Sequence, residues 1–276
     1  MAKPRVRKKA TRVDSEGKVR SYDRIKKGIY LAPNLVTSMG MIFGLIAISK
    51  TFEGDFVKAA WAIVIAGFFD GMDGKIARLT KTTSEFGIQL DSLADLVSFG
   101  VAPGVLVYQF ALRHSFAPSM GWAVAALFTI CGALRLARFN VQTHVVDGRW
   151  FVGMPIPAGA GIVVSSILFF NEIHWITDSG TASLPTFFLL VTLVVSVFMI
   201  STVPFWAMKD VEFFKKHAFG TLFFFIIFMV ILVREPERTL FIVGMIYFAR
   251  GPFLWILRRR SDKPLDVLME VEEEAE

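Results

Sequence analysis

The chain has 276 residues, of which 54% are hydrophobic and 28 are phenylalanine, and its formal net charge is +6. The mean hydropathy of +0.54 and several apolar runs long enough to cross a bilayer predict a polytopic, all-α membrane protein rather than a soluble enzyme. Cys131 is the single cysteine, which excludes an intrachain disulfide framework and a thiolate metal site.

Residues 1–31 carry eleven lysines and arginines against three acids, a net charge of +8. Residues 1–20 are expected to form a basic, disordered cytoplasmic tail. Beside a membrane domain, a topology signal and contact with anionic lipids explain such a tail better than nucleic-acid binding, so no nucleic-acid partner is expected. Residues 21–31 mix charged with apolar side chains, which predicts a short interfacial helix along the lipid headgroups.

From residue 32 onward the apolar runs predict about eight transmembrane helices, which form one membrane domain together with the interfacial helix, over residues 21–258. The predicted spans are 32–52, 56–79, 86–111, 119–141, 157–177, 185–206, 218–234 and 239–257. A count of six or seven stays open, because the last two runs are short and flanked by charge. Residues 259–276 are expected to be a charged cytoplasmic tail.

Basic residues between the predicted spans gather on the side of the N-terminus. The connections on that side carry Lys75, Arg78, Lys81, Arg149, Lys209, Lys215, Lys216, Arg258, Arg259 and Arg260, and the opposite connections carry Arg113, Arg234 and Arg238. This asymmetry follows the positive-inside rule, so both termini are expected on the cytoplasmic face of a bacterial-type inner or plasma membrane.

Four aspartates interrupt the second and third predicted spans: Asp70, Asp73, Asp91 and Asp95. The first two are three residues apart and the last two are four apart, so each pair lies on one helix face. Ionised carboxylates in a membrane span normally mark a functional site, and two such faces can meet only around a cation. An all-oxygen site suits Mg²⁺ or Mn²⁺, and these ions usually serve a phosphate.

Arg135, Arg138 and Asn140 are predicted at the cytoplasmic end of the fourth span, on the same side of the membrane as the aspartates. The unusual polar residues therefore converge at headgroup depth. A water-facing cavity in this place could hold a charged substrate and a lipid together.

The spacing Asp70-x₂-Asp73-Gly74-x₂-Ala77-Arg78-x₈-Gly87-x₃-Asp91-x₃-Asp95 resembles the complete signature of the CDP-alcohol phosphotransferases. Those enzymes have a six-helix core, join a CDP-activated group to an alcohol with release of CMP, and form homodimers. Three further stretches resemble the CDP-diacylglycerol–serine O-phosphatidyltransferases within that family: DSLADLVSFGVAP from Asp91, RLARFN from Arg135 and FVGMPIPA from Phe151. The resemblance covers roughly residues 32–165.

This resemblance implies transfer of the phosphatidyl group of CDP-diacylglycerol to the hydroxyl of L-serine, giving phosphatidylserine and CMP. Asp70, Asp73 and Asp91 are then the expected metal ligands, with Asp95 as a shared ligand and the general base. The residues expected to contact CDP-diacylglycerol are Asn34, Thr37, Gly74, Ala77, Arg78, Ser84 and Gly87. For Ser84, a helix N-cap is an almost equally good explanation.

Serine brings a carboxylate, and its recognition needs a cation. Arg135 and Arg138 are three residues apart near a helix C-terminus, so one is expected to bind serine and the other the lipid phosphate, with Asn140 as an amide donor nearby. The alternative is that both arginines are positive-inside anchors.

Two alternative functions stay open. One is the same chemistry with another acceptor, such as glycerol 3-phosphate, inositol or choline. The other is an ion-coupled transporter, which favours acids near mid-bilayer and internal repeats; this chain shows no repeat and places its acids at one interface. The first span also departs from the family, because PN-x-x-T is followed by Ser38, Met39 and Gly40 where the family often has Asn or Arg.

Overall fold

The computed structural model describes residues 22–80, 84–114, 118–142, 150–173, 183–206 and 218–260. Almost all of these residues are helical, which confirms the prediction of an all-α membrane protein in its main outline. Three helical stretches are long and apolar enough to cross a bilayer, namely Pro33–Phe52, Glu85–His114 and Pro118–Val141, and shorter apolar helices follow them. The predicted tails lie outside the described residues, except that residues 259–260 end the last helix.

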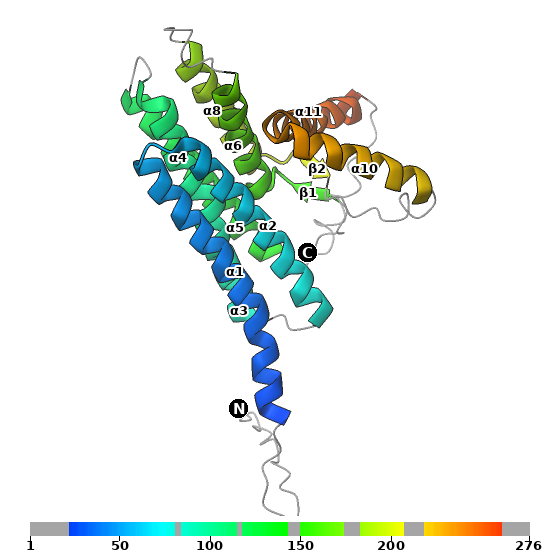
Figure 1. The fold of residues 1–276 in the computed structure, drawn as a ribbon. Coiled ribbons are helices and arrows are strands. Elements are labelled where there is room, and N and C mark those ends of the chain that lie inside the picture. Colours follow the sequence, from blue (N-terminus) through cyan, green and yellow to red (C-terminus); the bar gives the residue numbers. More distant parts are fainter. Residues whose placement is uncertain are drawn as a thin grey trace, which may run out of the picture.

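A bundle of roughly parallel helices forms the body of the described chain (Figure 1). Its members are α1 (Tyr22–Phe52), α2 (Phe56–Thr80), α3 (Glu85–Asp95), α4 (Ala102–Phe110), α5 (Pro118–Gln142), α6 (Ile156–Glu172) and α8 (Ser183–Ile200). The bundle core is apolar, with Phe128, Phe188 and Leu106 fully buried. Many apolar side chains on the outer faces are exposed, as expected of surfaces that contact lipid rather than water.

The first helix is longer than its predicted span. α1 runs without a break from Tyr22 through Pro33 to Phe52, so residues 22–31 extend the first apolar helix instead of forming a separate element. Their position at the headgroups stays a prediction. A tight turn at Gly54, with φ of +81°, then reverses the chain so that α2 packs back along α1.

The third predicted span is one continuous helical stretch with a change of winding in its middle. α3 passes directly into a π-helical segment, η1 (Leu96–Val101), and then into α4; a short 3₁₀ turn, η2 (Leu112–His114), ends it. π-helical turns are rare and occur frequently at functional sites. Here the wider turn begins directly after Asp95.

A close contact between α1 and η1 holds the first and third spans together. The Ser98 hydroxyl donates to the Gly40 carbonyl at 3.2 Å. A Cβ on Gly44 would lie 2.7 Å from Ser98 Oγ and 2.9 Å from Ser98 Cα. The spacing Gly40-x₃-Gly44 is therefore a helix-packing motif in which the absence of side chains lets two backbones approach closely.

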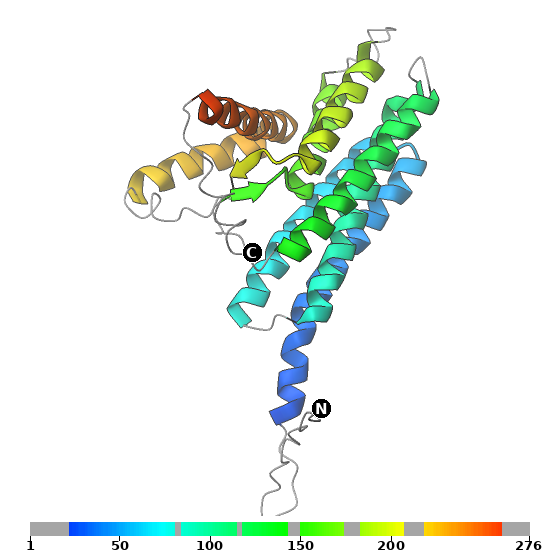
Figure 2. The same ribbon diagram turned by 180° about the vertical axis from the view of Figure 1, so that it is seen from behind.

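The second half of the bundle contains a short β-ribbon that the sequence did not predict. β1 (Trp150–Val152) pairs antiparallel with β2 (Pro204–Trp206), with Phe151 opposite Phe205. The predicted span 185–206 is accordingly too long, because α8 ends at Ile200 and the chain becomes extended. The ribbon lies between the bundle and the last two helices, as the view from behind shows (Figure 2).

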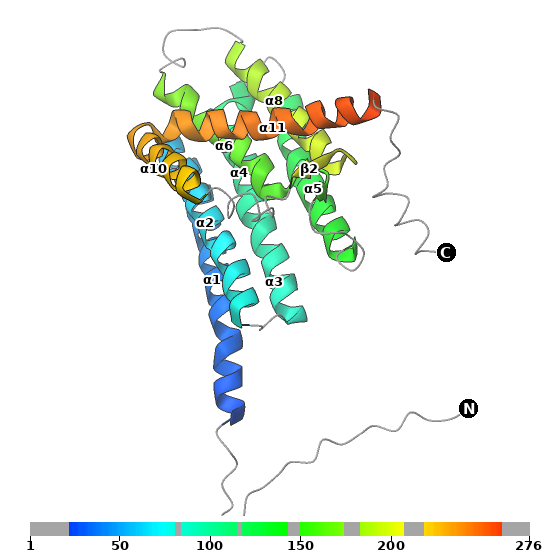
Figure 3. The ribbon, with the colours of Figure 1, turned by 90° about the vertical axis from the view of Figure 1, so that its right-hand side faces the viewer.

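The last two helices are α10 (Ala218–Arg234) and α11 (Pro236–Arg260), which coincide with the seventh and eighth predicted spans. α11 packs against α6 and contacts β2. Figure 3 shows that α11 runs across the bundle rather than along it. Their helical nature is confirmed, whereas their crossing of the membrane stays a prediction.

Replacing Gly44 by alanine is expected to lower the apparent melting temperature of the detergent-purified protein. The new methyl group would lie too close to the backbone of Ser98, and overpacking of this kind typically costs about 1–3 kcal/mol. Gly161→Ala is the matched control, because among the described residues no neighbouring segment lies within 4 Å of its added Cβ. Equal melting temperatures for the two variants would contradict the close α1–η1 contact.

Candidate functional site

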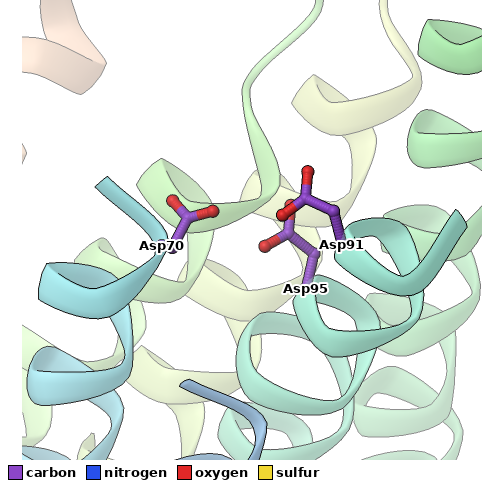
Figure 4. Close-up of side chains that lie close together, drawn as sticks. All are labelled: Asp70, Asp91 and Asp95. Atoms are coloured by element: carbon purple, nitrogen blue, oxygen red, sulfur yellow. The ribbon is translucent and has the colours of Figure 1, made fainter. Parts of the chain in front are cut away.

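The aspartates of α2 and α3 point toward one another across the gap between these two helices. Asp70 on α2 faces Asp91 and Asp95 on α3 (Figure 4). One carboxylate oxygen from each of the three lies within 4.8 Å of the others, which is the spacing of a metal-binding group. The prediction that the two acidic faces meet is therefore confirmed for these three residues.

Three carboxylates this close repel one another when ionised. At 4.8 Å and an effective dielectric constant of about 20, each pair costs roughly 3 kcal/mol. The Asp70 and Asp95 carboxyl groups also interact directly, and a shared proton or a cation would relieve the repulsion between them. A divalent cation relieves the repulsion within all three pairs at once, and oxygen ligands are what Mg²⁺ and Mn²⁺ prefer.

Asp73 lies beside this group rather than in it. It is only 5% exposed, and its Oδ2 is a buried oxygen without a hydrogen-bond partner among the described residues. Asp73 and the three clustered aspartates line one cavity of about 10 Å³, enough for a single water molecule or ion. The orphaned oxygen, the acidic lining and the size of the cavity all fit a bound divalent metal ion.

Three residues predicted to bind CDP-diacylglycerol meet at the start of α3. Ser84 Oγ accepts a hydrogen bond from the Gly87 amide at 3.0 Å, which makes Ser84 the N-cap of this helix. A Cβ on Gly87 would lie 3.2 Å from Asn34 Oδ1 on α1. The absence of a side chain at Gly87 thus allows α1 to approach the first turn of α3.

The remaining predicted lipid-binding residues lie on α1 and α2. Thr37 is buried, its hydroxyl donates to the Pro33 carbonyl at 3.0 Å, and it lines the aspartate cavity. Gly74 follows Asp73 on α2. Ala77 and Arg78 are also in α2, but their side chains lie outside the described part of the structure. Binding of CDP-diacylglycerol by these residues stays a prediction.

Arg135 on α5 is a buried cation that interacts electrostatically with the aspartates. It is only 7% exposed, and it lies within electrostatic range of both Asp95 and Asp70. Its guanidinium carbon is 5.2 Å from the centroid of the Phe139 ring, a cation–π arrangement. A buried arginine needs anionic partners, and the carboxylates of Asp95 and Asp70 are the acidic groups that interact with Arg135.

Arg138 donates its hydrogen bonds to backbone carbonyls. Its Nη1 donates to the Ile200 carbonyl at 2.9 Å, and its Nη2 donates to the carbonyls of Val152 at 2.8 Å and of Met199 and Ser201 at 3.3 Å. These contacts fasten α5 to the C-terminal end of α8 and to β1. They favour a structural role over the predicted contact with serine or phosphate.

Asn140, in the last turn of α5, reaches across to α3. Its side-chain amide donates to Ser92 Oγ at 2.8 Å, one residue after Asp91. The sequence led us to expect a binding role for Asn140, but not for Ser92 or for Ser98 in the wall of the aspartate cavity. The position of both serines beside the aspartates was a usable signal, but their partners lie 48 and 58 residues away and depend on the packing of the helices.

Curated relatives match most of the chain. A CDP-diacylglycerol–serine O-phosphatidyltransferase of Helicobacter pylori strain J99 is 39% identical over 229 residues, covering 83% of this chain and 92% of the relative. Proteins of the same name are 36% identical over 67% of this chain in Bacillus subtilis and 32% identical over 82% of it in Mycobacterium leprae. The matched regions cover 92% of the Bacillus subtilis relative and 74% of the Mycobacterium leprae relative.

The family assignment covers the region that contains the aspartates. Residues 30–184, from α1 to the start of α8, match the CDP-alcohol phosphatidyltransferase family. All four aspartates, Arg135 and Asn140 fall inside this stretch, whereas α10 and α11 lie beyond it. The chain belongs to the CDP-alcohol phosphatidyltransferase family.

Proposed function

We propose that this protein transfers the phosphatidyl group of CDP-diacylglycerol to the hydroxyl of L-serine, forming phosphatidylserine and CMP. The observation that carries the proposal is the meeting of Asp70, Asp91 and Asp95 within 4.8 Å in the family's signature spacing. The choice of serine is supported by relatives of that name at 32–39% identity over most of the chain.

In the proposed reaction, the hydroxyl oxygen of serine attacks the phosphorus on the lipid side of the diphosphate. The bond from that phosphorus to the CMP oxygen breaks, CMP leaves with the electron pair, and the hydroxyl proton passes to the Asp95 carboxylate. Mg²⁺ or Mn²⁺ held by the carboxylates would neutralise the diphosphate and stabilise the leaving group. Asp70, Asp73 and Asp91 are the proposed ligands, with Asp95 as a shared one.

The liponucleotide is proposed to lie against the ends of α1, α2 and α3. Asn34, Ser84 and Gly87 meet there, and the bare backbone at Gly87 leaves room for close approach. Thr37, Gly74 and Ala77 complete this wall, and Arg78 is proposed to bind a phosphate through its forked guanidinium.

Arg135 is proposed to bind the carboxylate of serine. Its guanidinium is buried and close to Asp95, so a serine held by Arg135 would present its hydroxyl to the proposed base. The contacts of Arg138 make it a support for this arrangement rather than a second ligand.

The active site and both termini are proposed to lie on the cytoplasmic face, with eight membrane spans. The basic connections support this orientation. The seventh and eighth spans require α10 and α11 to cross the bilayer upright, although they lie across the bundle in Figure 3. Labelling of single cysteines placed at residues 235 and 261 from each side of the membrane would decide the count.

A homodimer is also proposed, from family resemblance alone. The molar mass of the detergent-purified protein, measured by light scattering with the detergent subtracted, tests it directly.

Purified protein given CDP-diacylglycerol and Mn²⁺ or Mg²⁺ is expected to release CMP when L-serine is supplied. Removal of divalent ions by a chelator should stop the release, and added Mn²⁺ or Mg²⁺ should restore it. Glycerol 3-phosphate, inositol and choline serve as the comparison acceptors. Release with one of these and not with serine would replace the proposed acceptor while leaving the chemistry intact.

Asp91→Asn and Asp95→Asn are each expected to lower the rate of CMP release at least roughly 100-fold, because each removes an anionic ligand from the cluster. Their melting temperatures should not fall, since the carboxylate repulsion is reduced. Asp55→Asn is the control, because that carboxylate is bonded to Lys58 in an exposed turn. Near-normal rates for both cluster variants would rule out the proposed metal site.

Arg135→Ala is expected to raise the KM for serine about tenfold, because the variant loses one charge-assisted hydrogen bond to the substrate. The effect on the KM for CDP-diacylglycerol should be smaller. Arg135→Lys keeps the charge but loses the forked guanidinium. Its KM for serine should lie between those of the unmodified protein and of Arg135→Ala. Arg113→Ala is the control, because this exposed arginine bonds to Gln109 in the α4–α5 connection. An unchanged KM for serine in Arg135→Ala would make Arg135 a purely structural cation.

A further inference from the structure

We propose that the hydrogen bond between Asn140 and Ser92 is a positioning contact that fixes the geometry of the serine-binding part of the active site. It ties the last turn of α5 to α3, and so fixes Arg135 relative to Asp91 and Asp95. The inference rests on the proposed function, since it assigns Ser92 and Asn140 to the placement of the residue that holds serine's carboxylate.

The geometry gives the Ser92 hydroxyl a defined orientation. Its single proton is donated to the Ile88 carbonyl, one turn earlier on α3, at 3.1 Å. Its lone pairs remain as acceptors, and the Asn140 amide donates to one of them at 2.8 Å. Ser92 is thereby a fixed acceptor on α3, immediately after Asp91, for a donor from another helix.

The end of α5 is held from two sides. On one side Arg138 donates to the carbonyls of Ile200 and Val152 at 2.9 Å and 2.8 Å, which fastens α5 to α8 and β1. On the other side Asn140 reaches α3. Arg135 lies about one turn before these two residues and is buried next to the aspartates, so both contacts bear on where its guanidinium lies.

Packing against η1 and α4 places α5 beside the later part of the third span, but little direct packing joins α5 to α3. In the described part of the chain, α3 packs on α1 and η1, and α5 packs on α8, η1 and α4, while α3 and α5 hardly touch each other directly. The bond between Ser92 and Asn140 therefore ties α5 to the part of this helical stretch on which it hardly packs. A shift of about 1 Å in a positioning group can change a rate roughly 100-fold, so a bond that fixes the end of α5 against α3 is enough to matter.

The two helices are not equally free to move when this bond is lost. The start of α3 is fixed by its Ser84 cap and by the approach of Asn34 to Gly87. Asn140, by contrast, lies on the same helix as Arg135, five residues after it. Loss of the bond is thus expected to displace Arg135 more than the aspartates, and to affect serine more than the metal or the lipid.

The test is a double-mutant cycle on the full-length protein with Ser92→Ala, Asn140→Ala and the double variant. Each single variant is expected to raise the KM for serine about fivefold to tenfold, with the KM for CDP-diacylglycerol and the Mn²⁺ requirement changed less than twofold. The double variant should be no worse than the worse single one, because both substitutions remove the same bond. Ser92→Thr, which keeps a hydroxyl, should restore most of the affinity for serine.

Ser166→Ala is the matched control. Ser166 also donates to a carbonyl one turn earlier on its own helix, to Ile162 at 2.7 Å, but it accepts no bond from another helix among the described residues. It should leave the KM for serine unchanged.

Three outcomes would overturn the inference: a wild-type KM for serine in Ser92→Ala, additive effects in the double variant, or a Ser92→Thr variant as impaired as Ser92→Ala. None of these would affect the proposed function, which fails only if the unmodified protein releases no CMP with serine. If it uses another acceptor, the same cycle measured with that acceptor tests the bond.

Discussion

The repulsion among the carboxylates of Asp70, Asp91 and Asp95 is the constraint on which the rest of the arrangement depends. Helices carrying like charges would separate if nothing opposed them, so the fold must hold α2 and α3 together from outside the cluster. α1 does this, because it packs along α2 and also contacts α3 and η1. The bare backbone at Gly44 allows the contact with η1, and the aspartate cluster has the spacing to hold a cation.

The change of helical winding in the third span also helps to hold the acidic helices in place. α3 presents Asp91 and Asp95 to α2, and the π-helical η1 then changes the phase of the helix directly after the second carboxylate. As a result Ser98 faces the Gly40 carbonyl of α1, while the carbonyl of Gly100 accepts a hydrogen bond from Thr129 of α5 at 3.1 Å. One segment therefore connects the acidic helices to both of their neighbours.

Much of this site could be predicted from the sequence, because it depends on spacing within single helices. The three- and four-residue separations of the aspartates placed each pair on one face, and hydropathy placed both pairs at one end of their spans. What could not be predicted depends on contacts between distant segments. The separation of Asp73 from the other three, the bond from Asn140 to Ser92 and the β-ribbon all follow from how the helices pack, which no local pattern records.

The contacts of Arg138 have a consequence for how the protein is made. This arginine lies in the part of the chain that matches the family, but the carbonyls of Met199, Ile200 and Ser201 come from a later helix, beyond residue 184. During synthesis, the α5 end that carries Arg135 must wait for α8 before these acceptors exist. These contacts of Arg138 can therefore form only after the ribosome has passed the part of the chain that matches the family.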